Sequence, residues 1–149
     1  MKKKIFQYGL VYWLAILING IISFFYLAYS YSILISPEID PKDIIPLILI
    51  VLIGVFSPIP LYFLIRKHRL AVLTYSILLI LVITNFLGSV LWIVISEGKT
   101  KDGLPQSDYL LSLGIYLLIF GLWLIIVRKY RFKGMKTDLE IENIGKHED

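Results

Sequence analysis

The chain has 149 residues, of which 58% are hydrophobic and only 17% are charged, and its formal net charge is +4. A soluble domain would carry charges at about a quarter of its residues, so this composition argues against one. The chain contains no cysteine, which excludes disulfide frameworks, thiolate metal sites and thiol redox chemistry.

Charged residues are absent from four stretches, each of which meets or approaches the roughly 20 apolar residues that a transmembrane helix needs. The sequence therefore predicts an all-α, polytopic membrane protein, folded as one antiparallel four-helix transmembrane bundle. The predicted spans are residues 5–30, 44–65, 70–96 and 109–127, and residues 128–149 form a tail that is first basic and then polar.

The first predicted span is very long. As a helix it would measure about 39 Å, which exceeds the hydrocarbon thickness, so it must tilt or protrude. Tyr26, Tyr29 and Tyr31 near its far end predict an aromatic belt at the headgroup level. A cleaved signal peptide is the alternative, because the start is basic and Ala28 and Ser30 have the spacing of a small-residue cleavage site. The apolar region is longer than the roughly 7–15 residues of such a signal, which favours a retained span.

The second predicted span contains two prolines, Pro58 and Pro60. Prolines this close are expected to kink or break the helix. A broken helix can line a binding site, but prolines are also common in membrane helices, so a structural kink is the favoured interpretation. The turn that follows, residues 66–69, is so short that the second and third spans must be antiparallel neighbours.

Lysine and arginine are divided unevenly between the two sides of the predicted spans. Cytoplasmic loops carry the excess of these residues, so both termini and the 66–69 turn are predicted to lie in the cytoplasm, with the spans in the cell (plasma or inner) membrane. Twelve of the fifteen lie on that side: Lys2, Lys3, Lys4, Arg66, Lys67, Arg69, Arg128, Lys129, Arg131, Lys133, Lys136 and Lys146. The other side has Lys42, Lys99 and Lys101.

No Asp, Glu, Lys, Arg or His lies inside a predicted span. Ionisable groups within the bilayer usually mark proton relays, ion coupling or catalysis. The two histidines, His68 and His147, fall in the turn and the tail without partners at metal-ligand spacing. The sequence therefore predicts no catalytic residue, no metal site and no cofactor, and it disfavours an enzyme.

The main polar groups predicted inside the membrane are two amides. Asn19 and Asn85 lie fourteen and fifteen residues from the starts of their predicted spans, so we expect them at one depth, hydrogen-bonded across helices. Ser23 and Ser89, each four residues further on, extend this polar seam. A packing seam is the favoured interpretation, and a small polar cavity or substrate groove is the alternative.

The segment that follows the last predicted span combines basic and aromatic residues. Basic side chains at the membrane surface attract anionic lipid headgroups, at about 1 kcal/mol each. An ordinary stop-transfer flank is an equally favoured interpretation. The residues expected to contact the headgroups are Arg128, Lys129, Arg131, Lys133 and Lys136.

These features favour a small, non-enzymatic accessory, assembly or immunity-type interaction protein. Its partners would be the lipid bilayer and another membrane protein or a second copy of itself. Nucleic acid is not an expected partner, because the basic residues flank the spans and do not form a soluble basic face. The alternative is an oligomeric transporter or channel component with a neutral polar site at mid-membrane.

Overall fold

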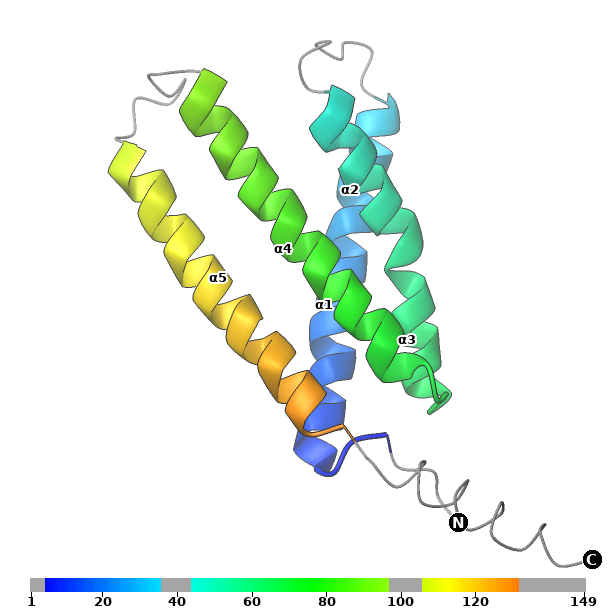
Figure 1. The fold of residues 1–149 in the computed structure, drawn as a ribbon. Coiled ribbons are helices and arrows are strands. Elements are labelled where there is room, and N and C mark those ends of the chain that lie inside the picture. The colour runs from blue at the N-terminus through cyan, green and yellow to red at the C-terminus, as the bar shows by residue number, and fades with distance from the viewer. Residues whose placement is uncertain (1–4, 36–43, 97–105, 132–149) are drawn as a thin grey trace, which may run out of the picture.

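The computed structural model describes residues 5–35, 44–96 and 106–131, and this part of the chain is almost entirely helical. The helices are α1 (Gly9–Ile35), α2 (Ile44–Phe56), α3 (Pro58–Ile65), α4 (Ala71–Ser96) and α5 (Gln106–Lys129). α3 continues in the direction of α2, so the chain passes along the bundle four times with alternating direction (Figure 1). Among the described residues, four segments are long and apolar enough to cross a membrane, as predicted.

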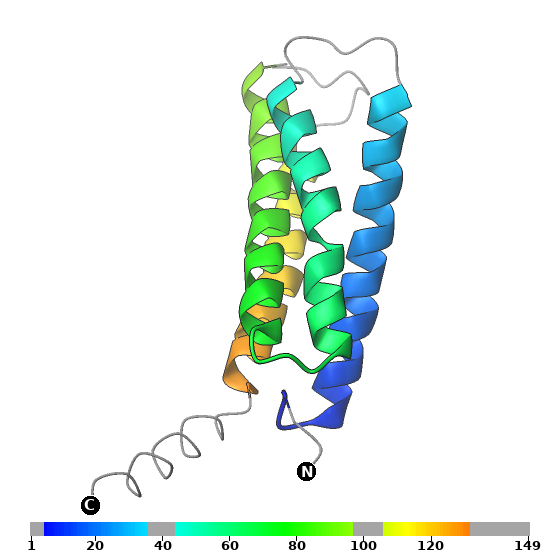
Figure 2. The same ribbon diagram turned by 90° about the vertical axis from the view of Figure 1, so that its right-hand side faces the viewer.

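One end of the bundle carries the basic side chains, and we call it the basic end. The N–H of Gln7 donates to the carbonyl of Tyr130 at 3.0 Å, and Phe6 forms an antiparallel bridge with Arg131. The first and last described residues therefore meet at this end, beside the turn between α3 and α4 (Figure 2). The six described Lys and Arg residues are Arg66, Lys67, Arg69, Arg128, Lys129 and Arg131.

α4 is the central helix, since it packs against α2, α3 and α5. Its most buried side chains recur at three- and four-residue intervals, which places them on one face of the helix. In a bilayer such an interior is held together by van der Waals packing, because lipid is as apolar as the side chains. The buried side chains in the first half of α4 are Ala71, Val72, Tyr75, Ser76, Leu78, Leu79 and Val82.

α5 is the least buried of the four membrane-length segments. Ring contacts attach it to α4. Tyr116 stacks on Phe86 of α4 with ring centroids 3.9 Å apart, and on Phe120 of its own helix at 4.4 Å. The indole N–H of Trp123 also donates to the hydroxyl of Tyr75 at 2.9 Å. α5 is therefore fixed by a few specific contacts along one face and leaves most of its surface uncovered.

The helix bounds differ from the predicted spans in physically simple ways. α1 begins at Gly9, four residues later than predicted, because residues 6 and 7 pair with the end of α5. It continues to Ile35, beyond the predicted end near residue 30. α5 extends past the predicted 109–127 at both ends, since polar residues continue its helix outside the apolar stretch.

The turn between α3 and α4 contains a residue in the left-handed region. Lys67 has a φ of 51°, which residues other than glycine rarely adopt. This conformation lets the N–H groups of Lys67 and His68 donate to the carbonyls of Leu64 and Phe63, at 3.1 and 2.9 Å. The last carbonyls of α3 are thereby satisfied, and the chain reverses into α4 as the short turn predicted.

Candidate functional site

The second membrane-length segment is interrupted at Ser57, between the end of α2 and the start of α3. Because Pro58 and Pro60 have no N–H, the carbonyls of Gly54 and Phe56 lose their usual helical donors. The hydroxyl of Ser57 donates to the carbonyl of Gly54 at 3.0 Å and so replaces one of them. The interruption that the prolines predict is present, and the Ser57 hydroxyl replaces the donor that the Gly54 carbonyl has lost.

Asn19 of α1 contacts this break through its side-chain amide. The amide oxygen accepts from the N–H of Leu61 at 2.9 Å, and the nitrogen donates to the carbonyl of Ser57 at 3.3 Å. The opposite orientation would set oxygen against a carbonyl and nitrogen against an N–H, so the surrounding backbone groups favour the one given. Ser23 lies with its hydroxyl 3.4 Å from the same fully buried amide. Asn19 thus joins α1 to the Ser57 carbonyl and the Leu61 N–H at the start of α3, which are not the carbonyls that the prolines leave without donors.

α1 and α2 approach each other closely at Gly54. A Cβ at this position would lie 2.5 Å from the hydroxyl oxygen of Ser30 and 3.0 Å from the carbonyl oxygen of Tyr26. The Ser30 hydroxyl donates to that Tyr26 carbonyl at 2.6 Å and lies 3.4 Å from the carbonyl of Ile50. A small residue here is therefore required for the two helices to pack, as is common between membrane helices.

Asn85 of α4 has a different partner from Asn19. Its side-chain nitrogen donates to the hydroxyl of Tyr26 on α1 at 3.3 Å. The hydroxyl of Ser89 donates to the backbone carbonyl of Asn85 at 2.8 Å, within the same helix. The structure thus brings Asn19 and Ser23 together, but it does not pair the two amides as the sequence led us to expect.

The partners show that the two amides lie at different depths. Asn19 meets the backbone of Ser57 and Leu61, whereas Asn85 meets the hydroxyl of Tyr26, which is seven residues further along α1 than Asn19. Each finds another partner, because an unpaired amide is costly away from water.

The tyrosines near the far end of α1 also divide into two kinds. Tyr29 and Tyr31 are 55% and 68% exposed, which suits the expected belt at the headgroup level. Tyr26 is only partly exposed and is bonded to Asn85, so it belongs to the interior of the bundle.

A pocket of about 280 Å³ lies beside Asn85, between α1, α2 and α4. Its walls are largely apolar and aromatic. Asn85 is 8% exposed, and its side-chain oxygen has no hydrogen-bond partner in the described part of the chain. The residues that line the pocket are Phe25, Tyr26, Tyr29, Ile50 and Asn85.

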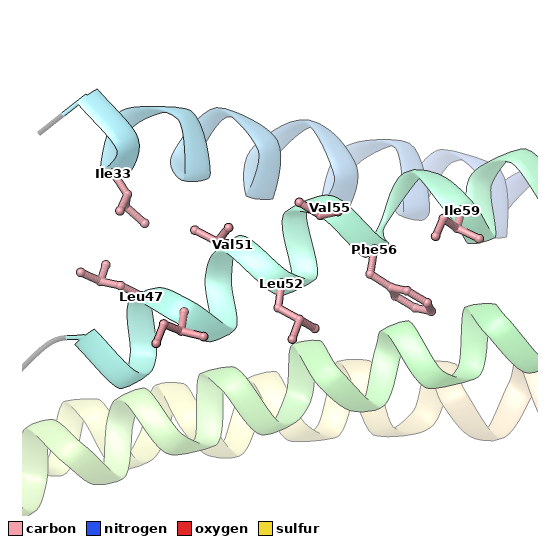
Figure 3. A pocket seen from close by; sticks show the side chains of 8 residues that line it. Ile33, Leu47, Val51, Leu52, Val55, Phe56 and Ile59 are labelled. Atoms are coloured by element: carbon pink, nitrogen blue, oxygen red, sulfur yellow. The ribbon is translucent and has the colours of Figure 1, made fainter.

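A larger groove of about 620 Å³ runs along α2. Figure 3 shows Ile33 of α1 facing the side chains of α2 across part of it, with Ile59 of α3 at its far end. Every side chain that lines it is apolar, which suits an acyl chain or an apolar helix face and not a polar substrate. The remaining lining residues are Leu47, Ile48, Val51, Leu52, Val55 and Phe56.

Basic side chains and tyrosine rings meet at the basic end. The ammonium group of Lys67 lies 5.3 Å from the ring centre of Tyr12, and that of Lys129 lies 5.8 Å from the ring centre of Tyr130. The hydroxyl of Tyr12 donates to the carbonyl of Leu64 at 3.2 Å, which ties α1 to α3 beside the turn. Each ring therefore lies against one side of an ammonium group.

The residues expected to contact anionic lipid fall partly within the structure. Arg128, Lys129 and Arg131 are exposed at the basic end. Lys133 and Lys136 lie outside the described residues. In residues 5–35, 44–96 and 106–131 the single acidic residue is Asp108, at the opposite end of the bundle. The described part of the basic end therefore carries positive charge without acidic neighbours.

No group of three or more His, Cys, Asp or Glu side chains that could hold a metal ion occurs in the described ranges. Comparisons with protein-family models, with curated proteins and with solved structures give no match. The function is therefore inferred from the residues themselves.

No role was predicted for Gly54, for Leu61 or for the hydroxyl of Tyr26 as a hydrogen-bonding partner. A signal was available for Gly54, because it precedes Pro58 by four residues and its carbonyl is the one which that proline leaves unpaired. The partners of Leu61 and Tyr26 come from other helices. Their identity depends on how the helices rotate against one another, which local sequence does not specify.

Proposed function

We propose that this chain is a non-enzymatic, multi-pass protein of the cell membrane that acts as an accessory, assembly or immunity-type interaction protein. The observation that carries the proposal is the pair of backbone contacts that the Asn19 side chain makes. Its fully buried amide is taken up by the backbone of Ser57 and Leu61, so this polar group serves packing. Function is then left to the outer faces of the helices and to the basic end.

The division of charge supports a cytoplasmic location for both termini. The six described cations lie at the basic end, where residues 7 and 130 are hydrogen-bonded, and Asp108 lies at the other end. Such an arrangement is favoured when the basic end faces the cytoplasm. Anionic lipid headgroups would then lie beside Arg128, Lys129 and Arg131, at a gain of about 1 kcal/mol for each basic residue.

The outer face of α5 supports a protein partner. Five apolar side chains follow one another on it at alternating intervals of four and three residues, the spacing by which one helix packs along another. Gly114 and Gly121 lie on the same helix with nothing within 4 Å of an added Cβ, so a second helix could approach there closely. The five exposed side chains are Leu111, Ile115, Leu118, Leu122 and Ile125.

The test is co-purification from native membranes in mild detergent, with the variant Gly121→Leu and the control Gly20→Leu. Neither glycine has an atom within 4 Å of an added Cβ, so both variants should fold. We expect the wild type and the control each to co-purify with one membrane protein, or with a second copy of this chain, at fixed stoichiometry. We expect Gly121→Leu to lose most of that partner. A chain that purifies alone as a monomer in every case would contradict the proposal.

An oligomeric transporter or channel component is the second candidate, and one observation favours it. The pocket beside Asn85 carries an amide oxygen that has no partner among the described residues, as a neutral substrate site would. Flux through liposomes that contain the purified chain tests this candidate. Solute movement above that of empty liposomes, lost in Asn85→Leu, would favour it over the interaction protein.

A further inference from the structure

We infer that the pocket between α1, α2 and α4 is a binding site for a neutral amphiphile that bears a free hydroxyl group, which the amide of Asn85 recognises. The inference goes beyond the proposed interaction function. It requires a ligand to bind, whether or not the chain has a protein partner or moves a solute.

The first argument is the incomplete hydrogen bonding of Asn85. Its only partner among the described residues is the hydroxyl of Tyr26, at 3.3 Å from the side-chain nitrogen. The side-chain oxygen is buried and has no partner. Turning the amide over would pair the oxygen and leave the nitrogen unpaired, so neither orientation satisfies both ends. A buried polar atom left in this way destabilises the free protein, which a ligand that pairs with it would relieve.

The second argument is the position of that amide on a pocket. Asn85 lines a space of about 280 Å³ together with side chains from two other helices. This volume lies near the lower limit of small-molecule sites, so it suits the polar head of a longer molecule. Tyr29 also lines the space.

The walls define the chemistry of the ligand. None of the five lining residues is acidic or basic, so a carboxylate or an ammonium group would lose its water without gaining a counter-charge. Phe25 and Ile50 offer apolar surface to a hydrocarbon body. A hydroxyl group can donate to the amide oxygen, the atom that has no partner among the described residues, and an ether cannot. The ligand class is therefore an alcohol on an apolar chain.

The location of the pocket fits a ligand that arrives through the bilayer. Tyr29 lies six residues, or about 9 Å, from the end of α1 at Ile35, on the side away from the basic end. The exposed face of Tyr29 opens toward the surroundings of the bundle. A fatty alcohol and a diacylglycerol both present a primary hydroxyl next to hydrocarbon at such a depth.

The experiment uses the full chain in lipid nanodiscs and a fatty alcohol that carries a photoreactive diazirine. Its methyl ether, which cannot donate a hydrogen bond, is the matched probe. We expect saturable labelling of residues 25–29, 50 or 85 by the alcohol, and labelling about fivefold weaker by the ether. Unlabelled dodecanol and dioctanoylglycerol serve as competitors, and the one that competes at lower concentration identifies the source of the hydroxyl.

Two variants complete the test. Asn85→Leu should reduce labelling by the alcohol to the level of the ether, whereas Ser89→Ala, one turn further along α4, should leave it unchanged. If Asn85→Leu does not fold, the comparison of alcohol with ether on the wild-type chain decides alone. Equal labelling by the two probes, or labelling that neither competitor reduces, would overturn the inference.

Discussion

The side-chain oxygen of Asn19 on α1 accepts a hydrogen bond from the backbone N–H of Leu61 on α3, at 2.9 Å. The nitrogen of the same amide lies 3.3 Å from the carbonyl of Ser57, the residue between α2 and α3. One side chain therefore contacts a donor and an acceptor of a helix that two prolines interrupt. In hydrocarbon, where no water can replace such contacts, this fixes the rotation of α1 against α3.

Replacing the amide should cost stability. We expect Asn19→Leu to lower the free energy of unfolding by about 1–3 kcal/mol, because it leaves buried backbone groups without their side-chain partner. Unfolding in detergent micelles measures the change. Thr84→Val removes a polar atom at an exposed position of α4 and is the matched control, with little expected effect. Equal losses in the two variants would count against the contact.

The approach of α1 to α2 should depend on Gly54. We expect Gly54→Ala to destabilise the bundle by about 1–3 kcal/mol, because the new methyl group would overlap Ser30 and the backbone of Tyr26. Gly88→Ala on α4 adds the same group where nothing lies within 4 Å. That control should be neutral or stabilising by up to about 1 kcal/mol, from helix propensity. The same unfolding measurement compares them, and a harmless Gly54→Ala would mean that the helices lie further apart.

The attachment of α5 should depend on one hydrogen bond between side chains. Tyr75→Phe removes the acceptor of the Trp123 indole N–H, which lies 2.9 Å from it. We expect a coupling of about 0.6–1.7 kcal/mol between Tyr75→Phe and Trp123→Phe in a double-mutant cycle of unfolding free energies. Trp13→Phe, at a residue that is 68% exposed, should show no coupling with Tyr75→Phe. Additive effects for both pairs would mean that the bond does not hold α5.

The two ends of the bundle should lie on opposite sides of the membrane. Because the chain has no cysteine, His68→Cys and Ser107→Cys each introduce a single thiol, one in the basic turn and one near the start of α5. An impermeant maleimide added outside cells should label the Cys at position 107 directly. It should label the Cys at position 68 only after the membrane is opened. Labelling of both from outside would contradict the predicted orientation.

The number and order of the helices could be predicted because each property is local. Four uncharged stretches define the membrane-length segments, and the short turn at residues 66–69 makes two of them neighbours. The proline pair likewise predicts the break at Ser57 from backbone chemistry alone. These elements follow from composition and from missing N–H groups, and neither depends on a distant residue.

The pairing of polar groups could not be predicted in the same way. Asn19 meets the backbone of Ser57 and Leu61, whereas Asn85 meets the hydroxyl of Tyr26, seven residues further along α1 than Asn19. Which partner an amide reaches depends on how the helices tilt and rotate against one another. Counting residues from the ends of the predicted spans does not give that arrangement.

The central claim is that the buried polar interior serves packing, with Asn19 joining α1 to the start of α3. It is tested most directly by measuring, for Asn19→Leu beside the wild type, both the free energy of unfolding and the partner that co-purifies from native membranes. We expect the free energy of unfolding to fall by about 1–3 kcal/mol and the stoichiometry of the partner to stay unchanged. Wild-type stability combined with loss of the partner would contradict the claim.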